Sequence, residues 1–314
     1  MQNNFNLRNI FPLLIAILSF SYMFSAPNAM AGWNLTFSDE FNGSSLDTSK
    51  WATTYPGGGR SAGGNGEQEY YSDTAFSFPA PGTSGYLRIN TSQKTQSYSQ
   101  CLNSTCDYTS GLINTSGKFS QTYGYYEMRT KLPSGKGLWP AFWLLPYPVN
   151  YSNEPFEVDI FEIGYANGPF MQGTFHYNNY AGQSYFNNTN NYSDGYHIFA
   201  VDWEPTYIKF YIDPLPDLSN PAYTITSNIP STPAFVLANM AIGGTWSAIG
   251  YPDSATITKI ANDTVPMDID YIRVYQKSSS GCYATIPSYS TIPSATCTPV
   301  DTTPPGAPKG LRVN

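Results

Sequence analysis

Short runs of aromatic and β-branched residues alternate with turns rich in Gly, Pro, Asn and Ser between Trp33 and Gln276. Typical runs are "YLRINT", "YHIFAVDW", "YIKFYID" and "MDIDYIRVYQ". No helical periodicity of useful length interrupts them. Many short strands at this spacing predict one all-β domain, a sandwich or jelly roll, and about 245 residues is an acceptable size for it.

One predicted strand carries an unusual load of acid. The stretch "EVDIFE", residues 157–162, places three carboxylates among Val, Ile and Phe. Plain alternation puts Glu157 and Asp159 on one face and Glu162 on the other. One extra residue, a β-bulge, would bring Glu162 round to join them. Because unpaired buried carboxylates are costly, the shared face is expected to line a solvent-filled groove.

Two carboxyl groups flanking a glycosidic bond are the minimum equipment for its hydrolysis, and Glu157 and Glu162 are suitable for this task. Asp159 between them is placed to hydrogen-bond one Glu and hold its charge state. Taken alone, the six-residue pattern is equally compatible with a calcium site or with a solvated acidic edge.

The strand before this motif supplies aromatic surface. In "GKGLWPAFWLLP", alternation places Trp139, Ala141, Trp143 and Leu145 on one face. Tryptophans facing a groove offer flat apolar surfaces to pyranose rings, although either one could serve equally well in a core.

A second candidate pair lies in "YGYYEMRTK", where Glu127 and Arg129 share a face. An acid and a base side by side can grip sugar hydroxyls. An ordinary surface ion pair is the competing interpretation.

Composition supports a neutral polar partner. Only 12% of residues are charged, 16% are aromatic, and the net charge is −7. With no basic run, nucleic acid and polyanions are not expected as partners. Aromatic surfaces with few charges suit sugars.

The two ends of the chain differ from the middle. Residues 1–31 combine Arg8, the apolar run "IFPLLIAILSF" and a small-x-small cleavage pattern in "NAMA", which predicts a secretory signal peptide. The apolar run is shorter than the ~20 residues of a membrane anchor. We therefore expect a secreted chain that starts near Gly32 and has no membrane attachment after cleavage. A monomer is also expected.

Beyond the domain, residues 278–304 are rich in Ser, Thr and Pro and are predicted to form a linker. The last residues, 305–314, resemble the beginning of a fibronectin type III module. In an exported chain the cysteines are expected to be oxidised. Local pairing, Cys101 with Cys106 and Cys282 with Cys297, is the simplest of three connectivities.

Taken together, these segments resemble glycoside hydrolase family 16, the laminarinase and lichenase group of endoglycanases. The resemblance covers nearly all of residues 33–276 and is carried by "FSDEFNGSSLDTSKW", "NGEQEYYSD", "FSQTYGYYEMRTKLPSGKGLWPAFWLLP", "EVDIFEIG", "LANMAIGGTW" and "PMDIDYIRVYQ". It implies a β-jelly-roll sandwich of two curved antiparallel sheets over residues 32–277, with the substrate cleft on the concave face.

The resemblance also implies roles for individual residues. "EVDIFE" is similar to the bulged, laminarinase-like version of the catalytic strand, so that Glu157 is the nucleophile, Glu162 the general acid/base and Asp159 the assisting acid of a retaining mechanism. The residues that it places along the cleft are Asn65, Glu69, Glu127, Arg129, Trp139, Trp143, His176 and Trp246.

No catalytic cofactor is implied, but family members often bind one structural calcium ion. Here that points to the backbone oxygens of Glu40 and Gly85 and to the side chain of Asp270, a hard-cation oxygen site. Asp270 could equally cap a turn.

The predicted function is a secreted endo-β-glucanase that cuts internal β-1,3 or β-1,4 bonds of β-1,3-glucan or mixed-linkage glucan. The alternatives are a noncatalytic glucan-binding jelly roll, or a galactan hydrolase of the agarase kind on the same fold. Retention of Glu157, Asp159 and Glu162 together argues against the binding module.

Overall fold

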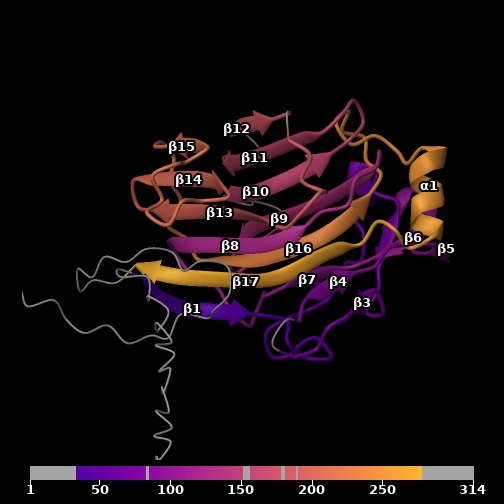
Figure 1. Ribbon diagram of the computed structural model, residues 1–314, viewed down its shortest axis with the longest axis horizontal. Helices are drawn as coiled ribbons and strands as arrows, with labels where there is room; N and C mark the ends of the chain where they lie inside the picture. Colours follow the sequence, from indigo (N-terminus) through magenta and orange to yellow (C-terminus); the bar gives the residue numbers. More distant parts are fainter. Residues whose placement is uncertain (1–32, 83–84, 151–155, 178–180, 189, 278–314) are drawn as a thin grey trace, which may run out of the picture.

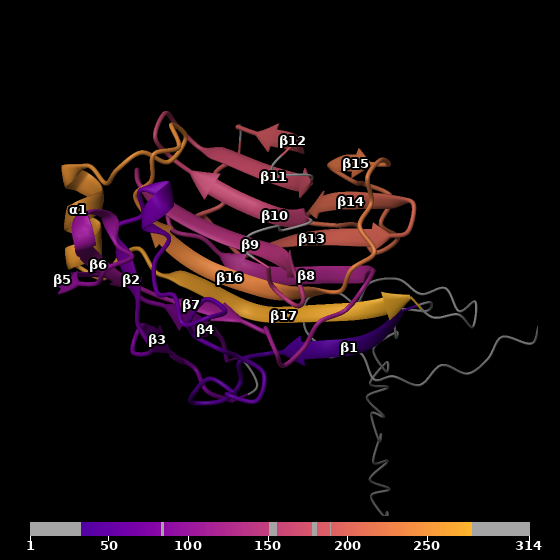
Figure 2. The same cartoon turned by 180° about the vertical axis from the view of Figure 1, so that it is seen from behind.

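Strands dominate the computed structural model, which describes residues 33–277 apart from 83–84, 151–155, 178–180 and 189. The predicted signal peptide, the linker, the terminal remnant and the second pair of cysteines lie outside the described residues. Nearly every strand pairs with antiparallel neighbours, and two large sheets stack face to face as two layers (Figures 1 and 2).

The first large sheet has eight strands. Its order is β15 (Tyr223–Ile225), β14 (Tyr207–Ile212), β13 (His197–Glu204), β8 (Gly124–Lys131), β17 (Met267–Lys277), β4 (Leu87–Ile89) and β3 (Phe76–Ser77), with β1 (Trp33–Asp39) also paired to β17. The β1–β17 pairing joins the start of the described chain to its end, so the domain closes on itself.

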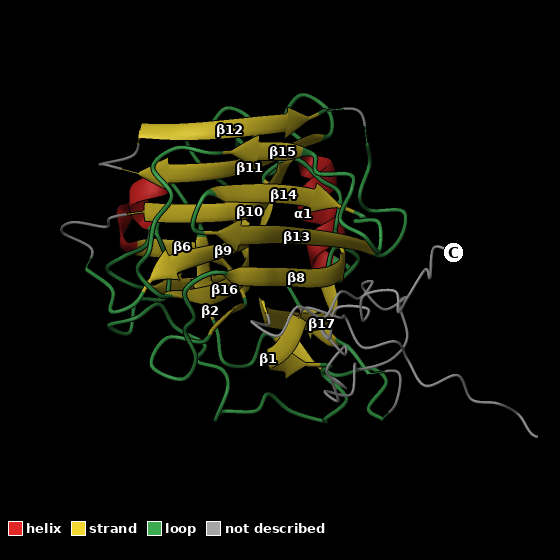
Figure 3. Ribbon diagram, turned by 90° about the vertical axis from the view of Figure 1, so that its left-hand side faces the viewer, coloured by secondary structure: helices red, strands yellow, loops and turns green. Residues whose placement is uncertain are grey.

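The second sheet has six strands and bears the cleft. Its order is β12 (Ala181–Asn187), β11 (Phe170–Tyr177), β10 (Phe156–Gly164), β9 (Leu138–Pro146), β16 (Ala234–Ile242) and β7 (Leu112–Asn114). Figure 3 shows β12, β11, β10 and β9 of this sheet beside β15, β14, β13 and β8 of the first sheet.

A core of apolar side chains fills the space between the large sheets. Tyr126 and Met128 of β8 meet Val158, Ile160 and Phe161 of β10 in the same buried cluster. Alternation along each strand leaves the opposite residues facing outward, so the outer face of the six-stranded sheet is free to carry polar groups. The predicted two-sheet sandwich is confirmed.

A third, small sheet closes one end of the cleft-bearing sheet. It consists of β5 (Ser92–Ser97), β6 (Thr105–Ser110) and β2 (Glu69–Tyr71), and β2 runs parallel to β6. The 3-10 turns Gly63–Asn65 and Leu102–Ser104 lie beside it. A disulfide joins Cys101 to Cys106, which confirms the local pairing predicted for these two cysteines.

One short helix, α1 (Ser254–Ala261), was not expected from the sequence. The side chain of Asp253 caps it by accepting a hydrogen bond of 2.8 Å from the backbone N–H of Thr256. Eight residues are too few to produce a clear amphipathic period, so the cap was the only available signal. Within the described part of the chain, no helix is long and apolar enough to span a membrane.

Candidate active site

The bulge in β10 gathers the three acids of "EVDIFE" on one face. Asp159 lies opposite Trp143 of β9, but Phe161, two residues later, lies opposite Phe142. The register with β11 shifts at the same point, between Asp159 and Glu162. Ile160 and Phe161 therefore both enter the core. The predicted bulge is confirmed, and Glu162 joins the other two acids at the cleft.

His176 of β11 completes the cluster. It lies opposite Glu157 in the strand register. Its Nε2 is 3.1 Å from Oδ2 of Asp159 and 3.9 Å from Oε1 of Glu157. The imidazole thus borders two of the three acids, which agrees with the position expected for it.

Burial shifts the pKa values of two of these acids away from those of exposed carboxyl groups. It raises the pKa of Asp159 to about 7, and a hydrogen bond with Glu157 acts in the opposite direction. Burial, reinforced by the charge of Asp159, raises the pKa of Glu162 well above its usual value. The indole nitrogen of Trp139 donates a 3.0 Å hydrogen bond to Glu162 and partly opposes this shift. Burial and the neighbouring charge therefore favour the protonated form of Glu162.

The acids lie at the bottom of a hollow of about 220 Å³. It is lined by Tyr55, Asn65, Glu67, Trp139, Ala141, Trp143, Glu157, Asp159, Glu162, Asn239 and Ala241. Trp139, Ala141 and Trp143 share this face, as the alternation in β9 predicted. Both indoles are thus at the cleft and not in the core.

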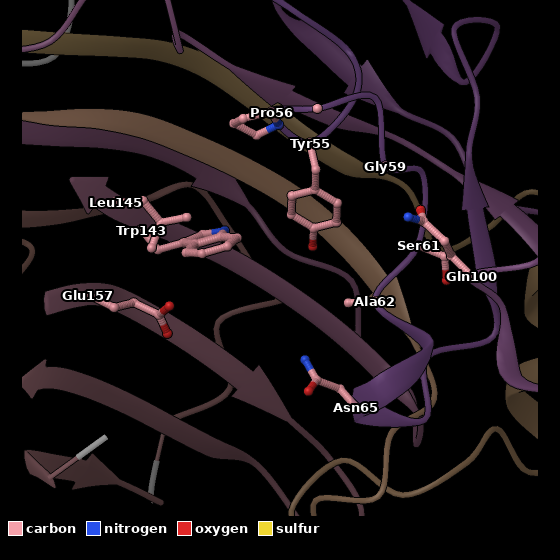
Figure 4. Close-up of a pocket in the computed structure, with 11 residues that line it drawn as sticks. Tyr55, Pro56, Gly59, Ser61, Ala62, Asn65, Gln100, Trp143, Leu145 and Glu157 are labelled. Carbon is pink, nitrogen blue, oxygen red and sulfur yellow. The ribbon is translucent and has the colours of Figure 1, made fainter. Parts of the chain in front are cut away.

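Two larger hollows extend the central one. The first, about 540 Å³, lies towards the loop that carries Tyr55, and Figure 4 shows Tyr55, Asn65, Trp143 and Glu157 pointing into it. The second, about 520 Å³, is lined in part by Phe170, Phe186 and Trp246. The ring of Trp246 lies 5.7 Å from that of Trp139, so Trp246 borders the cleft as expected. The first hollow shares four lining residues with the central one, and the ring contact between Trp139 and Trp246 lies between the central hollow and the second.

Glu127 and Arg129 do not lie in the cleft, and this part of the prediction is wrong. They share a face of β8, but β8 belongs to the eight-stranded sheet, and they point away from the core on its outer side. Glu127 is 1% exposed, with Nη1 of Arg273 at 3.9 Å from its carboxylate. Arg129 forms an ion pair with Asp270.

Glu69 is also misplaced by the prediction. It is fully buried behind the cleft, and its Oε2 accepts a 2.7 Å hydrogen bond from the backbone N–H of Ile242. Glu67, two residues earlier on the same side, lines the central hollow instead. The sequence reasoning also missed Tyr55, whose loop position gives no strand pattern to read.

The predicted calcium ligands are neighbours at one corner of the eight-stranded sheet. β1 ends with Asp39 opposite Ile272, and β4 begins with Leu87 opposite Ile269, which brings the following Glu40 and the preceding Gly85 towards Asp270. Oxygen atoms from these residues suit calcium. However, the Asp270 carboxylate already accepts a hydrogen bond from Arg129, so the guanidinium competes with any cation.

Metal-ligand spacing also occurs in the acid cluster. Glu157, Asp159 and His176 each offer one ligand atom within 4.8 Å of the others. All three lie on the neighbouring strands β10 and β11.

Residues 83–271 match the family model for glycosyl hydrolases family 16. The chain belongs to glycoside hydrolase family 16. It is 32% identical to the glucan endo-1,3-beta-glucosidase A1 of Niallia circulans over 79% of this chain and 39% of that one. It is likewise 32% identical to an endo-1,3-1,4-beta-glycanase of Rhizobium meliloti, over 76% of this chain and 51% of the relative. This family 16 chain therefore spans about half of these relatives, or less.

Among solved structures, the laminarinase catalytic domain of Thermotoga maritima resembles this family 16 protein with a TM-score of 0.65 and 31% identity. The match covers 79% of this chain and 99% of that domain. The family and the β-jelly-roll fold predicted from the sequence are thus both confirmed.

Proposed function

We propose that this protein is a secreted endo-β-glucanase that hydrolyses internal β-1,3 or β-1,4 linkages of β-1,3-glucan or mixed-linkage glucan with retention of configuration. The observation that carries the proposal is the β10 bulge, which brings Glu157, Asp159 and Glu162 to one face of an aromatic groove. The name of the Niallia circulans relative supports a glucan substrate with β-1,3 linkages, and that of the Rhizobium meliloti relative supports a β-glycan with 1,3 and 1,4 linkages.

In the first step, Glu162 donates its proton to the glycosidic oxygen while a carboxylate oxygen of Glu157 attacks the anomeric carbon. The bond to the leaving sugar breaks, and a covalent glycosyl-enzyme forms. In the second step, Glu162 removes a proton from water, the water oxygen attacks the anomeric carbon, and Glu157 is released as a carboxylate. Asp159, with His176 against it, holds the charge state of Glu157 between these steps.

The groove suits a neutral polysaccharide. Trp139, Trp143 and Tyr55 supply flat surfaces for sugar rings, and the polar groups beside them supply hydrogen bonds. A hollow that continues on both sides of the acids accommodates an internal bond of a chain. No cofactor is needed for this chemistry.

The deciding experiment is reducing-end release by the purified mature chain from laminarin, lichenan, curdlan, agarose and carboxymethylcellulose, with Glu157→Gln as the matched control. Release from laminarin or lichenan that the variant lacks supports the glucanase. Release only from agarose would move the assignment to galactan hydrolysis. Binding without release on every polymer would favour the noncatalytic binding module.

Secretion, a monomeric state and bound structural calcium are further parts of the proposal. The predicted signal peptide over residues 1–31 supports export. Glu40, Gly85 and Asp270 would hold the calcium ion. The ion would have a structural and not a catalytic role, since Asp270 lies in β17 of the opposite sheet from the acids, and Glu40 and Gly85 adjoin β1 and β4 of that same sheet.

A further inference from the structure

Glu67 and Glu69 form a pair of buried carboxyl groups directly beside the cleft. Glu67 is 3% exposed and Glu69 is 0% exposed. The charge of Glu67 acts on the carboxyl group of Glu69. Two ionised carboxylates buried side by side repel each other, and a hydrogen bond between them needs one proton because a carboxylate has none to donate. The pair is therefore expected to hold one proton.

The polarity of the surrounding hydrogen bonds identifies the protonated partner. The indole N–H of Trp143 can only donate, and it does so to Oδ1 of Asn239 over 2.8 Å. This fixes the amide of Asn239, whose Nδ2 donates to the hydroxyl oxygen of Tyr71 over 2.9 Å. The hydroxyl hydrogen of Tyr71 is then free to point at Oε2 of Glu67, 3.4 Å away.

Glu67 receives a second donor on its other oxygen. Nδ2 of Asn65 donates to Oε1 of Glu67 over 3.2 Å. A carboxyl group with donors on both oxygens is the ionised one. Oε2 of Glu69 accepts from the backbone N–H of Ile242, whereas its buried Oε1 has no donor and can carry the shared hydrogen.

We propose that Glu67 and Glu69 share one proton, carried by Glu69, and that the resulting acid–carboxylate pair positions Asn65 and Trp143 at the cleft. Glu67 contacts Asn65 directly and reaches Trp143 through Tyr71 and Asn239. Glu69 touches neither Asn65 nor Trp143 and acts on them only through Glu67. Both acids therefore act through other side chains, as positioning residues. The effect on substrate rests on the proposed function, whereas the shared proton does not.

The electrostatic surroundings agree with this assignment. Burial, followed by the charge of Glu67, raises the pKa of Glu69 well above its usual value. Burial also raises the pKa of Glu67, but hydrogen bonds from Glu69, Asn65 and Tyr71 oppose the shift. The titratable groups facing the pair are the phenols of Tyr55 and Tyr71, with Glu162 across the cleft. None of these groups is a cation, so none of them offsets a second negative charge on the pair.

The sign of the resulting pH dependence follows from linkage. The folded protein holds the proton of Glu69 more tightly than the unfolded chain does. The stabilising contribution is therefore present below the unfolded pKa of a glutamic acid and is lost as the pH rises towards the folded value. Glu69→Gln removes this loss, because the amide accepts from Ile242 through its oxygen and donates to Glu67 at every pH.

The test compares Glu69→Gln with Glu67→Gln. Melting temperatures from pH 5 to 9 are measured for both variants and wild type. KM and kcat are measured on whichever polysaccharide of the panel the wild type cleaves. We expect the Glu69→Gln curve to meet the wild-type curve near pH 5 and to exceed it by a few degrees near pH 9. Its KM and kcat should stay within about twofold of wild type.

Glu67→Gln should behave differently, because one amide cannot accept from both Asn65 and Tyr71. We expect KM to rise about tenfold, the equivalent of one hydrogen bond to a charged group, with a smaller change in kcat. Parallel melting curves for Glu69→Gln and wild type would overturn the shared proton. A tenfold rise in KM for Glu69→Gln would overturn the asymmetry. If Glu67→Gln does not fold, the melting curves of Glu69→Gln still decide the location of the proton.

The two proposals can fail separately. A chain that cleaves no glucan but cleaves agarose refutes the glucanase and leaves the test of the pair intact. The melting curves need no substrate at all.

Discussion

The indole nitrogen of Trp139 donates a hydrogen bond to Oε1 of Glu162 over 3.0 Å. The bond favours the ionised form of Glu162, against the burial that favours the protonated form. Besides its proposed contact with sugar rings, Trp139 therefore moderates how tightly Glu162, the proposed general acid, holds its proton.

Trp139→Phe should raise the pKa of Glu162 further while keeping an aromatic ring in the cleft. We expect the alkaline limb of the pH profile of kcat/KM to move to higher pH, because this limb reports loss of the acid's proton. At neutral pH, kcat/KM should fall by no more than about tenfold, since both catalytic carboxyls remain. The measurement is a pH profile on laminarin or lichenan.

Trp143→Phe is the matched control. The indole nitrogen that this substitution removes donates to Asn239 and not to Glu162. KM should rise while the alkaline limb stays where it is in the wild type. An equal displacement of the limb in both variants would show that general loss of cleft structure, and not the bond to Glu162, controls the pH profile.

The roles of the two glutamates predict different responses to the leaving group. Glu162→Gln should lose about 10²–10⁴-fold in kcat on polysaccharide, whose leaving oxygen needs a proton. With an aryl β-glucoside carrying an acidic phenol, bond cleavage needs little protonation, so Glu162→Gln should still release phenol in a burst. Glu157→Gln should lose both reactions while retaining fold and glucan binding. A phenol burst from Glu157→Gln would exchange or refute the assigned roles.

Alternation along single strands predicted much of the site. It placed Trp139 and Trp143 on one face and required the bulge that unites Glu157 with Glu162. These inferences succeeded because the period of two is a local property of the backbone.

The errors concern properties that depend on distant partners. Glu127 and Arg129 do share a face, but pairing of β8 with β13 and β17, far away in the sequence, decides which sheet carries that face. Glu69 is fully buried, and its carboxyl group is hydrogen-bonded to the backbone of Ile242 in β16, a strand far away in the sequence. Strand pattern alone contains neither piece of information.

Glu127→Gln tests the corrected position of this residue. Burial raises the pKa of Glu127 to about 7, against the opposing charge of Arg273. Because the folded pKa is the higher one, the stabilising contribution is complete below the unfolded value and is lost as the pH rises to about 7. The non-titrating variant should therefore gain stability relative to wild type between pH 5 and 8, by up to about 3 kcal/mol.

The measurement is denaturant unfolding across that pH range, together with kcat/KM at neutral pH. The value of kcat/KM should stay within about twofold of wild type, because Glu127 lies on the outer face of the eight-stranded sheet and not in the cleft. A large loss of kcat/KM without a change in unfolding would return Glu127 to the cleft.

Calcium binding at Asp270 should depend on the competing Arg129. An ion that binds only the folded protein, present at 100 times its Kd, adds about 2.7 kcal/mol of stability. We expect calcium to raise the melting temperature of the chelator-treated wild type by several degrees, and to have no such effect on Asp270→Asn, which lacks the charged ligand.

Because Arg129 donates to the Asp270 carboxylate, Arg129→Gln should bind calcium more tightly and reach the full shift at a lower calcium concentration. Equal shifts for Asp270→Asn and wild type would place the ion elsewhere, and a weaker response of Arg129→Gln would mean that the guanidinium organises the carboxylate for calcium instead of competing with it.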